Sequence, residues 1–420
     1  MTDPVRFLRG LFACAVAAAD PGQCLAQHLS GLDPGPLIVL GAGKAATQMA
    51  AAIEAAWPYR VSGLVVTRHG HARPCRSVRV LQAGHPMTDE ASLAAAKALI
   101  AAARDVPEDA QVVFVISGGG SALIGLPLAP MSMADYIRMQ TALLASGAPI
   151  EEINCLRRHV LALAGGRLAL ACRARRQLTL ILSDVPGDAP HAIASGPTVP
   201  DPTRCAEALA VARRWRIPLP DAVAVALQRG EMETAKPHDA RFAACHHRII
   251  ASGMTALEPA ARAARAAGIA AYILGDSIQG EARHVAMAFA AMARHAATTG
   301  QSFVPPCVLL SGGELSVTVH NPDGSGGRNS AFLLALAIGL AGADGIFALA
   351  ADTDGIDGVG AAAGAVVLPD TLARAEACGL EPRQMLDDDR SGAFFARLGD
   401  DVITGPTGTN VNDFRAILLV

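Results

Sequence analysis

Short apolar runs that end in loops of glycine, serine or aspartate recur along this sequence, and segments with a helical pattern separate most of them. The run over residues 112–117 is apolar up to its final serine, which is typical of a central strand in a parallel sheet, where both faces are buried. Strands that alternate with helices build βαβ units. The pattern therefore predicts an α/β protein with a mostly parallel sheet.

One of these loops, residues 181–202, is especially long. It follows the apolar run 178–182 and contains Asp184 and Asp188. Ligands of open α/β sheets bind at the carboxyl ends of the strands, and this loop is longer than a connection requires. We therefore expect it to contribute to a functional site. The alternative is a rigid surface loop in which the aspartates cap turns.

The length of the chain, 420 residues, exceeds one ordinary hydrophobic core and predicts two or three domains. The sequence becomes polar around residues 233–239, so we place a domain boundary there. Residues 1–238 are assigned to a first domain and residues 239–420 to a second. The formal net charge of -3 gives no indication of a nucleic acid or a membrane surface as a partner.

Two further properties concern the cellular compartment. No segment reaches the roughly 18 uninterrupted apolar residues that a membrane span needs. The 9 cysteines include no C-x-x-C pair, and an odd number argues against a disulfide framework. Reduced thiols in the cytoplasm are the favoured interpretation.

A glycine turn with one lysine follows the first predicted strand, residues 37–40. Gly41 and Gly43 lead into Lys44 and an alanine-rich helix, so backbone N–H groups and a helix N-terminus face the end of the strand. That arrangement suits an anion. The turn is neither a Rossmann fingerprint nor a Walker loop, because the third glycine and the Lys-Ser/Thr pair are absent. Lysine is rare in this chain, which directs attention to Lys44.

A second glycine loop follows the strand over residues 112–117. Its members can approach a ligand closely through the glycines and donate to phosphate oxygens through the serines; they are Ser117, Gly118, Gly119, Gly120 and Ser121. The alternative is a flexible turn. The strand before the loop and the helix-like run after residue 131 favour a binding loop.

Residues 151–170 have a helical pattern and carry a basic cluster. The cluster can be a solvated face of the helix. Equally, Asn154, Arg157 and His159 can point toward a ligand. The sequence leaves both interpretations open.

The second half repeats the strand–loop pattern. Glu314 follows the apolar run 307–310, in a Ser-Gly-Gly-Glu segment that resembles the glycine loop of the first half. Arg328 and Asn329 stand at the expected N-terminus of an apolar helix, where an anion is favoured.

Two polar tracts precede the end of the chain. Residues 352–358 hold three aspartates, Asp354 among them, between glycines at the end of a predicted strand, and such a loop can bind a hard cation such as Mg²⁺. The glutamate that an EF-hand needs is missing, so calcium is rejected. Residues 404–413, which include Asn410, form a glycine-rich polar tract of a kind that plain surface turns do not usually have.

Taken in order, the motifs GAGKAA, GHPMTDEAS, ISGGGSAL, EINCLRRH, ILSDVPGD with IASGPTVPDPT, LLSGGE, GGRN, DTDGIDG and TGPTGTNVND form a specific set. In this order they resemble the glycerate 2-kinase family, whose C-terminal domain is named after its MOFRL motif. Some members of that family carry the label hydroxypyruvate reductase. The resemblance covers nearly the whole chain from residue 41 onward.

The resemblance implies an architecture and a reaction. It implies a Rossmann-like first domain, a distinct α/β second domain containing the MOFRL region (about residues 305–420), and an active site in the cleft between them. It implies ATP-dependent phosphorylation of D-glycerate at its 2-hydroxyl to 2-phospho-D-glycerate and ADP, with Mg²⁺. By resemblance, Lys44 and Arg328 are the catalytic cations.

Phosphoryl transfer depends on charge neutralisation and in-line positioning. Asp184 is the first choice for the group that orients or deprotonates the hydroxyl, with Asp188 in reserve. Glu314 and Asp354 are the candidate metal ligands. The remaining candidates sort into a phosphate-binding set of Gly41, Gly43, residues 117–121 and Asn329, and a substrate or supporting set of Asp188, Asn154, Arg157, His159 and Asn410. D-glycerate and ATP are the expected partners, and a homodimer is left open.

Two other classes remain as alternatives. The glycine turn at Gly41 supports an NAD(P)H-dependent hydroxypyruvate reductase, but Ala46 stands at the third glycine position, and Arg68-His69 stands where an acidic residue for the ribose is expected. A non-catalytic anion-binding relative is the other alternative. Against it stand the intact Lys44 and the aspartate loops, because such groups are costly to bury without a use.

Overall fold

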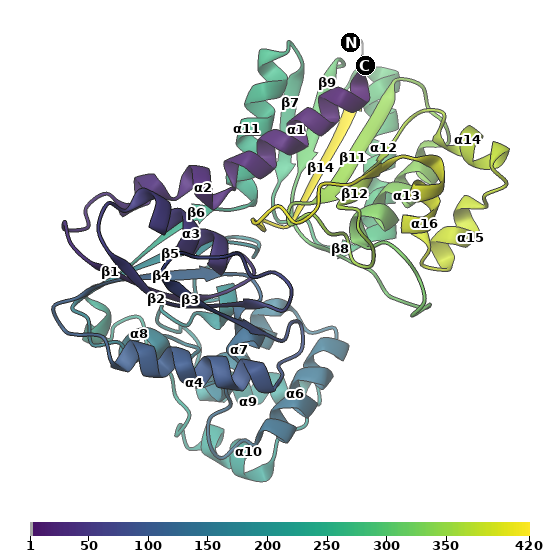
Figure 1. Cartoon of the computed structure of the whole chain (residues 1–420). Coiled ribbons are helices and arrows are strands. Elements are labelled where there is room, and N and C mark those ends of the chain that lie inside the picture. The colour runs from purple at the N-terminus through teal and green to yellow at the C-terminus, as the bar shows by residue number, and fades with distance from the viewer. Residues whose placement is uncertain (1–2) are drawn as a thin grey trace. The chain divides into compact units, whose positions relative to one another are not determined.

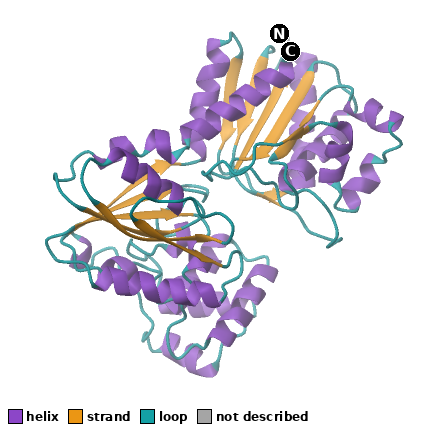
Figure 2. Ribbon diagram, in the orientation of Figure 1, coloured by secondary structure: helices purple, strands orange, loops and turns teal. Residues whose placement is uncertain are grey.

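The computed structural model describes residues 3–420, which form two compact units (Figure 1). We call residues 21–183 and 188–250 the parallel-sheet unit. We call residues up to 20, residues 184–187 and residues 251–420 the mixed-sheet unit. Helices and strands alternate in both units (Figure 2), so the predicted α/β class is confirmed.

The parallel-sheet unit has a six-stranded sheet in the order β3-β2-β1-β4-β5-β6. Its strands are β1 (Leu37–Ala42), β2 (Val61–Arg68), β3 (Val78–Ala83), β4 (Gln111–Ser117), β5 (Arg176–Leu182) and β6 (Cys245–Ala251). The pairs β2–β3, β1–β2, β1–β4 and β4–β5 are parallel. This is the strand order of a doubly wound sheet, and the predicted Rossmann-like first domain is confirmed.

Helices enclose this sheet. Helices α3 (Ala46–Ala56) and α4 (Glu90–Arg104) pack on the strands of its first half. Every residue of β4 is buried, which explains why its sequence is apolar from Val112 to Ile116 and does not alternate. Short helices complete the connections: α2 (Pro21–Cys24), η1 (Ala26–Leu29), α5 (Gly120–Leu123), α8 (Arg167–Ala171), η2 (Ile193–Ser195) and η3 (Ala240–Phe242).

A second apolar core lies in a helical layer of the same unit, formed by α6 (Met133–Ala145), α7 (Ile150–Val160), α9 (Cys205–Arg214) and α10 (Asp221–Gln228). The helix expected over residues 151–170 is two helices, α7 and α8. Gly165 and Gly166 separate them with φ angles of 58° and 82°, which lie outside the helical range.

The mixed-sheet unit has a sheet in the order β13-β12-β11-β14-β9-β7. Its strands are β7 (Ala270–Gly275), β9 (Cys307–Ser311), β11 (Ile346–Asp352), β12 (Gly364–Val367), β13 (Asp401–Val402) and β14 (Asp413–Leu419). The β7–β9 pair is parallel and the other pairs are antiparallel. Strands β8 (Gly280–Glu281) and β10 (Leu315–Ser316) form a separate parallel pair. This sheet contains both parallel and antiparallel pairs, unlike the first one, so the predicted distinct second α/β domain is confirmed.

Both faces of the mixed sheet carry helices. Helices α12 (Ala282–Thr299) and α13 (Arg328–Leu340) share one core with β9, β11, β12 and β14. Helices α1 (Pro4–Ala18) and α11 (Gly253–Ala266) pack on strands of the same sheet, with α1 in front of it in Figure 1. Helices α14 (Thr371–Ala377), α15 (Pro382–Asp387) and α16 (Ser391–Leu398) complete the unit beside α13.

The compact units divide the chain differently from the predicted boundary between residues 238 and 239. Strand β6 adds to the edge of the parallel sheet, so the division falls after residue 250. Helix α1 belongs to the mixed-sheet unit because Phe12 packs on Phe414 of β14, with 5.7 Å between the ring centroids. Both differences arise from contacts between residues far apart in the sequence.

Across residues 3–420, no helix is both long enough and apolar enough to cross a membrane.

The packing of α1 gives a test. Replacing Phe12 with Ala removes a ring that is 3% exposed, and such a truncation costs about 3–5 kcal/mol of stability. We expect faster amide hydrogen exchange in β11 and β14, the strands that α1 packs on, and unchanged exchange in β4.

The matched control is Arg6→Ala, an exposed position on the same helix, which is expected to change stability by less than about 0.5 kcal/mol. Equal loss of protection in β4 and β14 of the Phe12 variant would contradict the assignment of α1 to the mixed-sheet unit.

Candidate active-site residues

The two glycine loops of the parallel-sheet unit form one hydrogen-bonded junction. Strands β1 and β4 are parallel neighbours, so the loops that follow them leave the same edge of the sheet at the point where the strand order reverses. The Lys44 N–H donates to the Gly118 carbonyl at 2.9 Å, and the Ala45 N–H donates to Ser117 Oγ at 3.0 Å. The structure therefore brings together the residues that the sequence singled out in both loops.

Glycine is required at the centre of this junction. Gly43 has a φ of 148°, and a Cβ there would lie 2.0 Å from Ser117 Oγ. A Cβ at Gly41 would lie 1.9 Å from the Val115 carbonyl oxygen. Ser117 is fully buried and accepts a hydrogen bond from the backbone, so its hydroxyl holds the two loops together.

The second glycine loop is also fixed to the long loop that begins after β5. Ser121 Oγ and Ser195 Oγ are 2.7 Å apart. Ser195 Oγ donates to Asn154 Oδ1 at 3.1 Å, and Asn154 Nδ2 donates to the Ala192 carbonyl at 3.0 Å. Asn154 is buried, so it positions the backbone around residues 192–195 beside the glycine loop.

Positive side chains gather around the same glycine loop. Burial, followed by the charges of Lys44, Arg68 and Arg157, lowers the pKa of His85 to about 3. A Cβ at Gly119 would lie 2.9 Å from His85 Nε2 and 3.3 Å from Lys44 Cγ, so both side chains lie against that glycine. His85 is therefore neutral at physiological pH, while Lys44, Arg68 and Arg157 supply positive charge suited to an anion.

Arg157 has an unsatisfied donor. Its Nε is buried and has no hydrogen-bond partner within residues 3–420. Buried donors are nearly always paired, so an oxygen of a bound anion is a suitable partner for this atom. The interpretation of Arg157 as a ligand-facing residue gains support from this geometry, whereas a solvated face does not explain a buried Nε.

His159 lies in a different environment from the other members of this set. It is fully buried, and its ring nitrogens contact the Cys155 carbonyl at 2.9 Å and Glu233 Oε1 at 3.1 Å. These partners belong to α7 and to the segment after α10, not to the glycine loops.

Sequence reasoning missed Arg68 and His85 as site residues. Arg68 is the last residue of β2, and His85 follows β3 by two residues. Strand β2 is the neighbour of β1, and β3 is the neighbour of β2. Both positions therefore lie at the carboxyl ends of strands of the same parallel sheet, so strand position was a usable signal.

The two candidate bases, Asp184 and Asp188, lie in different compact units. Asp184 lies in the short segment that groups with the mixed-sheet unit, and its carbonyl accepts a hydrogen bond from the Asn412 side chain. Asp188 lies in the parallel-sheet unit with a φ of 54°, an uncommon value for a residue other than glycine.

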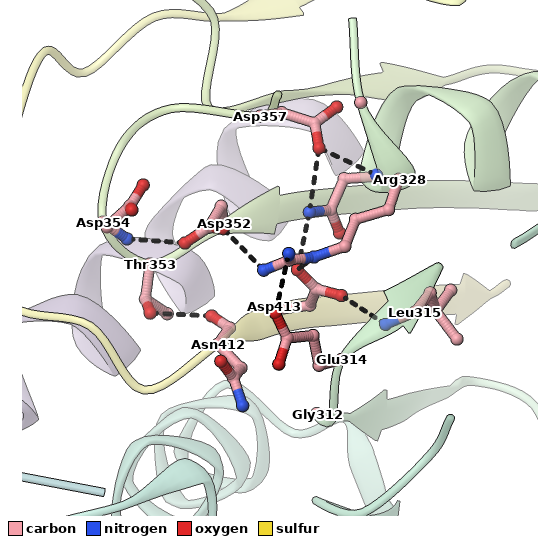
Figure 3. Close-up of polar contacts among 12 residues, drawn as sticks. Gly312, Glu314, Leu315, Arg328, Asp352, Thr353, Asp354, Asp357, Asn412 and Asp413 are labelled. Atoms are coloured by element: carbon pink, nitrogen blue, oxygen red, sulfur yellow. Dashed lines mark hydrogen bonds and ion pairs between the residues drawn. The ribbon is translucent and has the colours of Figure 1, made fainter. Parts of the chain in front are cut away.

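In the mixed-sheet unit the central feature is a guanidinium among carboxylates (Figure 3). Arg328, the first residue of α13, donates from Nε to Asp413 Oδ1 at 2.7 Å, from Nη1 to Glu314 Oε1 at 3.0 Å and from Nη2 to Asp352 Oδ2 at 2.8 Å. Only 24% of the Arg328 side chain is exposed. Arg328 therefore binds protein carboxylates in this structure.

The sheet topology explains why three acidic residues from distant segments meet. Strand β14 lies antiparallel between β9 and β11, so its first residue, Asp413, pairs with the last residue of β11, Asp352. Glu314 follows β9 at the same edge. The sequence singled out Asp352 only as one of three aspartates in a loop that can bind a cation, and Asp413 only as the end of a polar tract. It did not predict their proximity, because that depends on this long-range pairing.

Burial and neighbouring charges shift the acid–base properties of this cluster. Burial, with Asp354 and Asp413 adding to it, raises the pKa of Asp352 well above its usual range, although Arg328 opposes the shift. Burial disfavours the charged form of Arg328, but Asp413, Asp352 and Glu314 hold its pKa well above the usual value. The guanidinium is the group that keeps these buried acids compatible with one another.

A second arginine completes the cluster. Arg415 is 1% exposed and donates from Nη1 to Asp413 Oδ2 at 3.0 Å. Its guanidinium lies 5.7 Å from the ring centroid of Phe332. Two guanidinium groups thus bind the two oxygens of Asp413, a carboxylate that is itself buried.

The helix N-terminus expected to bind a ligand anion already faces a carboxylate. Asp357 accepts the N–H groups of Asn329 at 2.9 Å and of Ser330 at 2.8 Å. Asn329 Nδ2 donates to Asp413 Oδ1 at 2.8 Å. The N–H groups of Asn329 are therefore bound to protein carboxylates, which does not favour its predicted role in phosphate binding. Its Oδ1 is buried and has no hydrogen-bond partner in the described part of the chain, and as an acceptor it suits a hydroxyl group or a cation and not a phosphate oxygen.

The two predicted metal ligands have different partners. Glu314 pairs with Arg328, whereas the Asp354 carboxylate accepts the Ile356 N–H at 2.9 Å. Figure 3 shows the Asp354 side chain directed away from the Arg328 guanidinium. Its N–H donates to Asp352 Oδ1 at 2.9 Å, so Asp352 lies between Asp354 and Arg328. The carboxylate chemistry of the cluster fits Mg²⁺, with Asp352 added to the predicted ligands.

The polar tract 404–413 holds this loop in place. The Thr407 N–H donates to the Asp354 carbonyl at 3.1 Å, and Asn412 accepts the Thr353 N–H at 3.0 Å. Asn410 is buried, and its Oδ1 accepts the Asn412 N–H at 3.2 Å. Asn410 thus shapes the backbone of the tract.

A pocket of about 300 Å³ opens beside Arg328 within the mixed-sheet unit. Its walls include Gly326, Gly327, Leu315, Val317 and Leu386. This volume is at the small end of the range for small-molecule sites.

Comparisons with known proteins agree with the architecture. Residues 7–228 match a domain of unknown function, DUF4147, and residues 307–413 match the MOFRL family. A putative hydroxypyruvate reductase of Agrobacterium vitis is 48% identical over 98% of this chain and 94% of its own length. The glycerate 2-kinase of Pyrococcus horikoshii is 35% identical over 95% of this chain and 93% of its own.

A solved structure is similar over the whole chain. The crystal structure of glycerate kinase from Thermotoga maritima matches with a TM-score of 0.87 and 34% identity, covering 99% of both chains. The fold and these similarities define a class of α/β phosphotransferases with a parallel-sheet domain and a MOFRL domain. The chain belongs to the glycerate kinase family.

The Arg328 cluster gives a test of its energetics. Replacing Arg328 with Met leaves the buried carboxylate of Asp352 without its cation and leaves Asp413 with Arg415 alone. Loss of one partner of a buried pair costs about 3–5 kcal/mol. We expect strong destabilisation of the mixed-sheet unit at pH 8, measured by hydrogen exchange in β11 and β14.

The pH dependence has a definite sign. The folded pKa of Asp352 is raised, so its neutral form favours folding below the unfolded pKa, and this contribution is lost as pH rises through the folded pKa. Without Arg328 the folded pKa rises further, so the deficit of the variant shrinks toward pH 5. A deficit that stays the same from pH 5 to pH 8 would contradict the model. Arg283→Met, which removes an exposed pair with Asp387, is the control.

Proposed function

We propose that this protein catalyses ATP-dependent phosphorylation of D-glycerate at its 2-hydroxyl, giving 2-phospho-D-glycerate and ADP, with Mg²⁺. The observation that carries the proposal is the junction of two glycine loops at the reversal of strand order, surrounded by Lys44, Arg68 and Arg157. The names of full-length relatives, among them glycerate 2-kinase, supply the substrate.

The glycine loops are proposed to bind phosphate groups. Phosphoryl transfer requires neutralisation of charge on the transferring group more than covalent chemistry. Lys44 and Arg157 supply positive charge, and the Arg157 Nε supplies a donor that is unsatisfied in the protein. Neutral His85 beside Gly119 can exchange a hydrogen bond with a ligand without adding charge.

The Arg328 cluster is proposed to bind substrate and metal. Glu314 is 48% exposed and is the most accessible of the three carboxylates on Arg328, whereas Asp352 and Asp413 are buried. An anionic ligand can therefore replace Glu314 on the guanidinium while the buried pairs persist. Glu314, once released, and Asp352 can then bind Mg²⁺, with Asp354 as a further ligand after rotation of its side chain. The bound ion would neutralise phosphate charge.

A carboxylate is proposed to receive the proton of the 2-hydroxyl. Asp184 remains the first choice and Asp188 the alternative. A base needs to reach hydrogen-bond distance of the hydroxyl in the substrate complex. Replacement of each with Asn, which preserves shape and removes basicity, separates the two: the base variant loses kcat, while the other chiefly changes KM.

The relatives named hydroxypyruvate reductase make a reductase the second candidate. The sequence offers it little support, because Ala46 replaces the third glycine and Arg68 ends the strand where an acidic residue for a ribose is expected. Titration with NADH separates the classes: we expect no quenching of NADH fluorescence and no oxidation of NADH by hydroxypyruvate.

The central experiment couples two assays. The protein is supplied with ATP, Mg²⁺ and D-glycerate, ADP release is measured, and the product is passed to enolase without added phosphoglycerate mutase. ADP release with formation of phosphoenolpyruvate supports phosphorylation at the 2-hydroxyl. A requirement for mutase places the phosphate at the 3-position and contradicts the proposal. Absence of ADP release contradicts the kinase assignment itself.

Lys44 gives a quantitative prediction. Lys44→Met removes the ammonium but keeps most of the side-chain volume, and loss of one group that stabilises transition-state charge costs about 100-fold or more in kcat. The control is Lys97→Met, at an exposed position on α4, for which kcat and KM stay unchanged. Retention of full kcat in the Lys44 variant would contradict its catalytic role.

The cellular location and the oligomeric state of the protein remain predictions. All 9 cysteines are unpaired, which fits the proposed cytoplasmic location, where thiols are kept reduced. A homodimer is the other proposal, and sedimentation equilibrium measures it directly.

A further inference from the structure

The helical layer of the parallel-sheet unit contains a group of metal-ligating side chains that the proposed reaction does not use. His159 lies near the end of α7, Cys205 is the first residue of α9, and Glu233 follows α10. One nitrogen, one sulfur and one oxygen of these side chains all lie within 4.8 Å of one another. Nitrogen, thiolate sulfur and carboxylate oxygen are the three ligand types that zinc sites combine.

A neutral His159 can donate a hydrogen bond to only one of the two acceptors that its ring nitrogens face. Nδ1 is 2.9 Å from the Cys155 carbonyl oxygen, and Nε2 is 3.1 Å from Glu233 Oε1. Both partners are acceptors, yet a neutral imidazole carries one N–H. If Nδ1 donates to the carbonyl, the lone pair of Nε2 faces a carboxylate. A cation between Nε2 and the carboxylate satisfies both lone pairs.

The hydrogen bond from His159 Nδ1 to a backbone carbonyl is of the kind that metal-binding histidines make. A histidine that binds a metal nearly always donates its other N–H to a carbonyl or a carboxylate, which fixes the ring and directs its lone pair. The contact from Nδ1 to Cys155 supplies this second interaction. Bond lengths of about 2.0–2.3 Å to zinc in a tetrahedral site place ligand atoms about 3–4 Å apart, a spacing consistent with the 3.1 Å between Nε2 and Oε1.

We propose that His159, Cys205 and Glu233 bind a divalent transition metal of the zinc class. His159 and Cys205 are buried, while the Glu233 side chain is 36% exposed and gives solvent access to the site. Water completes the coordination. Binding releases the proton of the Cys205 thiol to solvent, because the thiolate is the ligand. The bound ion links α7, α9 and the segment after α10, so its role is structural.

Lys236 lies within hydrogen-bond distance of one of the proposed metal ligands. Its Nζ is 2.5 Å from Glu233 Oε1 and 2.7 Å from Thr234 Oγ1. Arg167 donates to the Met232 and Glu233 carbonyls, and Asp201 Oδ2 lies 3.9 Å from His159 Nδ1. The ammonium of Lys236 therefore neutralises Glu233 and competes with the metal for that carboxylate.

The test uses Co²⁺ as the probe. Purified full-length protein is stripped with chelator under reducing conditions and titrated with Co²⁺. Thiolate coordination produces a sulfur-to-cobalt charge-transfer band, which we expect at one equivalent of Co²⁺ and which Zn²⁺ abolishes by displacement. This readout is independent of kinase activity, so failure of the proposed reaction and failure of the metal site are distinguishable.

Two ligand variants and a matched control assign the site. Cys205→Ser is expected to lose the charge-transfer band, and His159→Gln to weaken Co²⁺ binding by roughly 10- to 100-fold or more. Cys378→Ser, at an exposed thiol, keeps the band and the affinity. Circular dichroism of each metal-free variant verifies that it folds.

Lys236→Met provides a variant that gains function. Removal of the competing ammonium is expected to tighten Co²⁺ binding several-fold while the fold is retained. Absence of a charge-transfer band in wild type, or persistence of the band in Cys205→Ser, overturns the proposal. Unchanged affinity in Lys236→Met overturns the competition between the ammonium and the metal.

Discussion

The guanidinium of Arg328 among three carboxylates is the interaction on which the mixed-sheet unit depends most directly. Asp352 and Asp413 are almost completely buried, and adjacent buried acids repel one another unless a cation lies between them. Strand β14 lies between β9 and β11, and this pairing brings the acids together. The topology therefore brings together negative charges that Arg328 and Arg415 neutralise. The same arginines and carboxylates are the groups proposed to bind substrate and metal.

The parallel-sheet unit depends on a different constraint, which is the close approach of two glycine loops at the carboxyl ends of β1 and β4. The Lys44 N–H binds the Gly118 carbonyl, and Ser117 fills the space that a side chain at Gly43 would occupy. Lys44, Arg68 and Arg157 then place positive charge beside glycine residues, whose backbone is not covered by side chains. One unit thus offers cationic groups to an anion, whereas the other presents carboxylates arranged around a cation.

Sequence reasoning succeeded where the signal was local. Strand, glycine turn and helix occur within a few residues around Lys44 and around Ser117, so a mostly parallel sheet and both loops could be predicted, while the Rossmann-like arrangement came from the family resemblance. The meeting of Asp352, Asp413 and Arg415 could not be predicted, because it depends on antiparallel pairing of β14 with strands far back in the chain. The same limit explains why a boundary based on polarity alone gave no indication that α1 packs on the mixed sheet.

The contact of α1 with β14 has a consequence for biosynthesis. Phe12 of α1 is synthesised long before Phe414 of β14, on which it packs. The apolar stripe of α1, with Leu8, Leu11 and Phe12 buried in the finished protein, therefore has no native partner in the mixed-sheet unit until α11 has been made, because α1 packs on α11, β11 and β14. The parallel-sheet unit can complete its core first, so chaperones that bind nascent apolar helices have a defined target at the start of this chain.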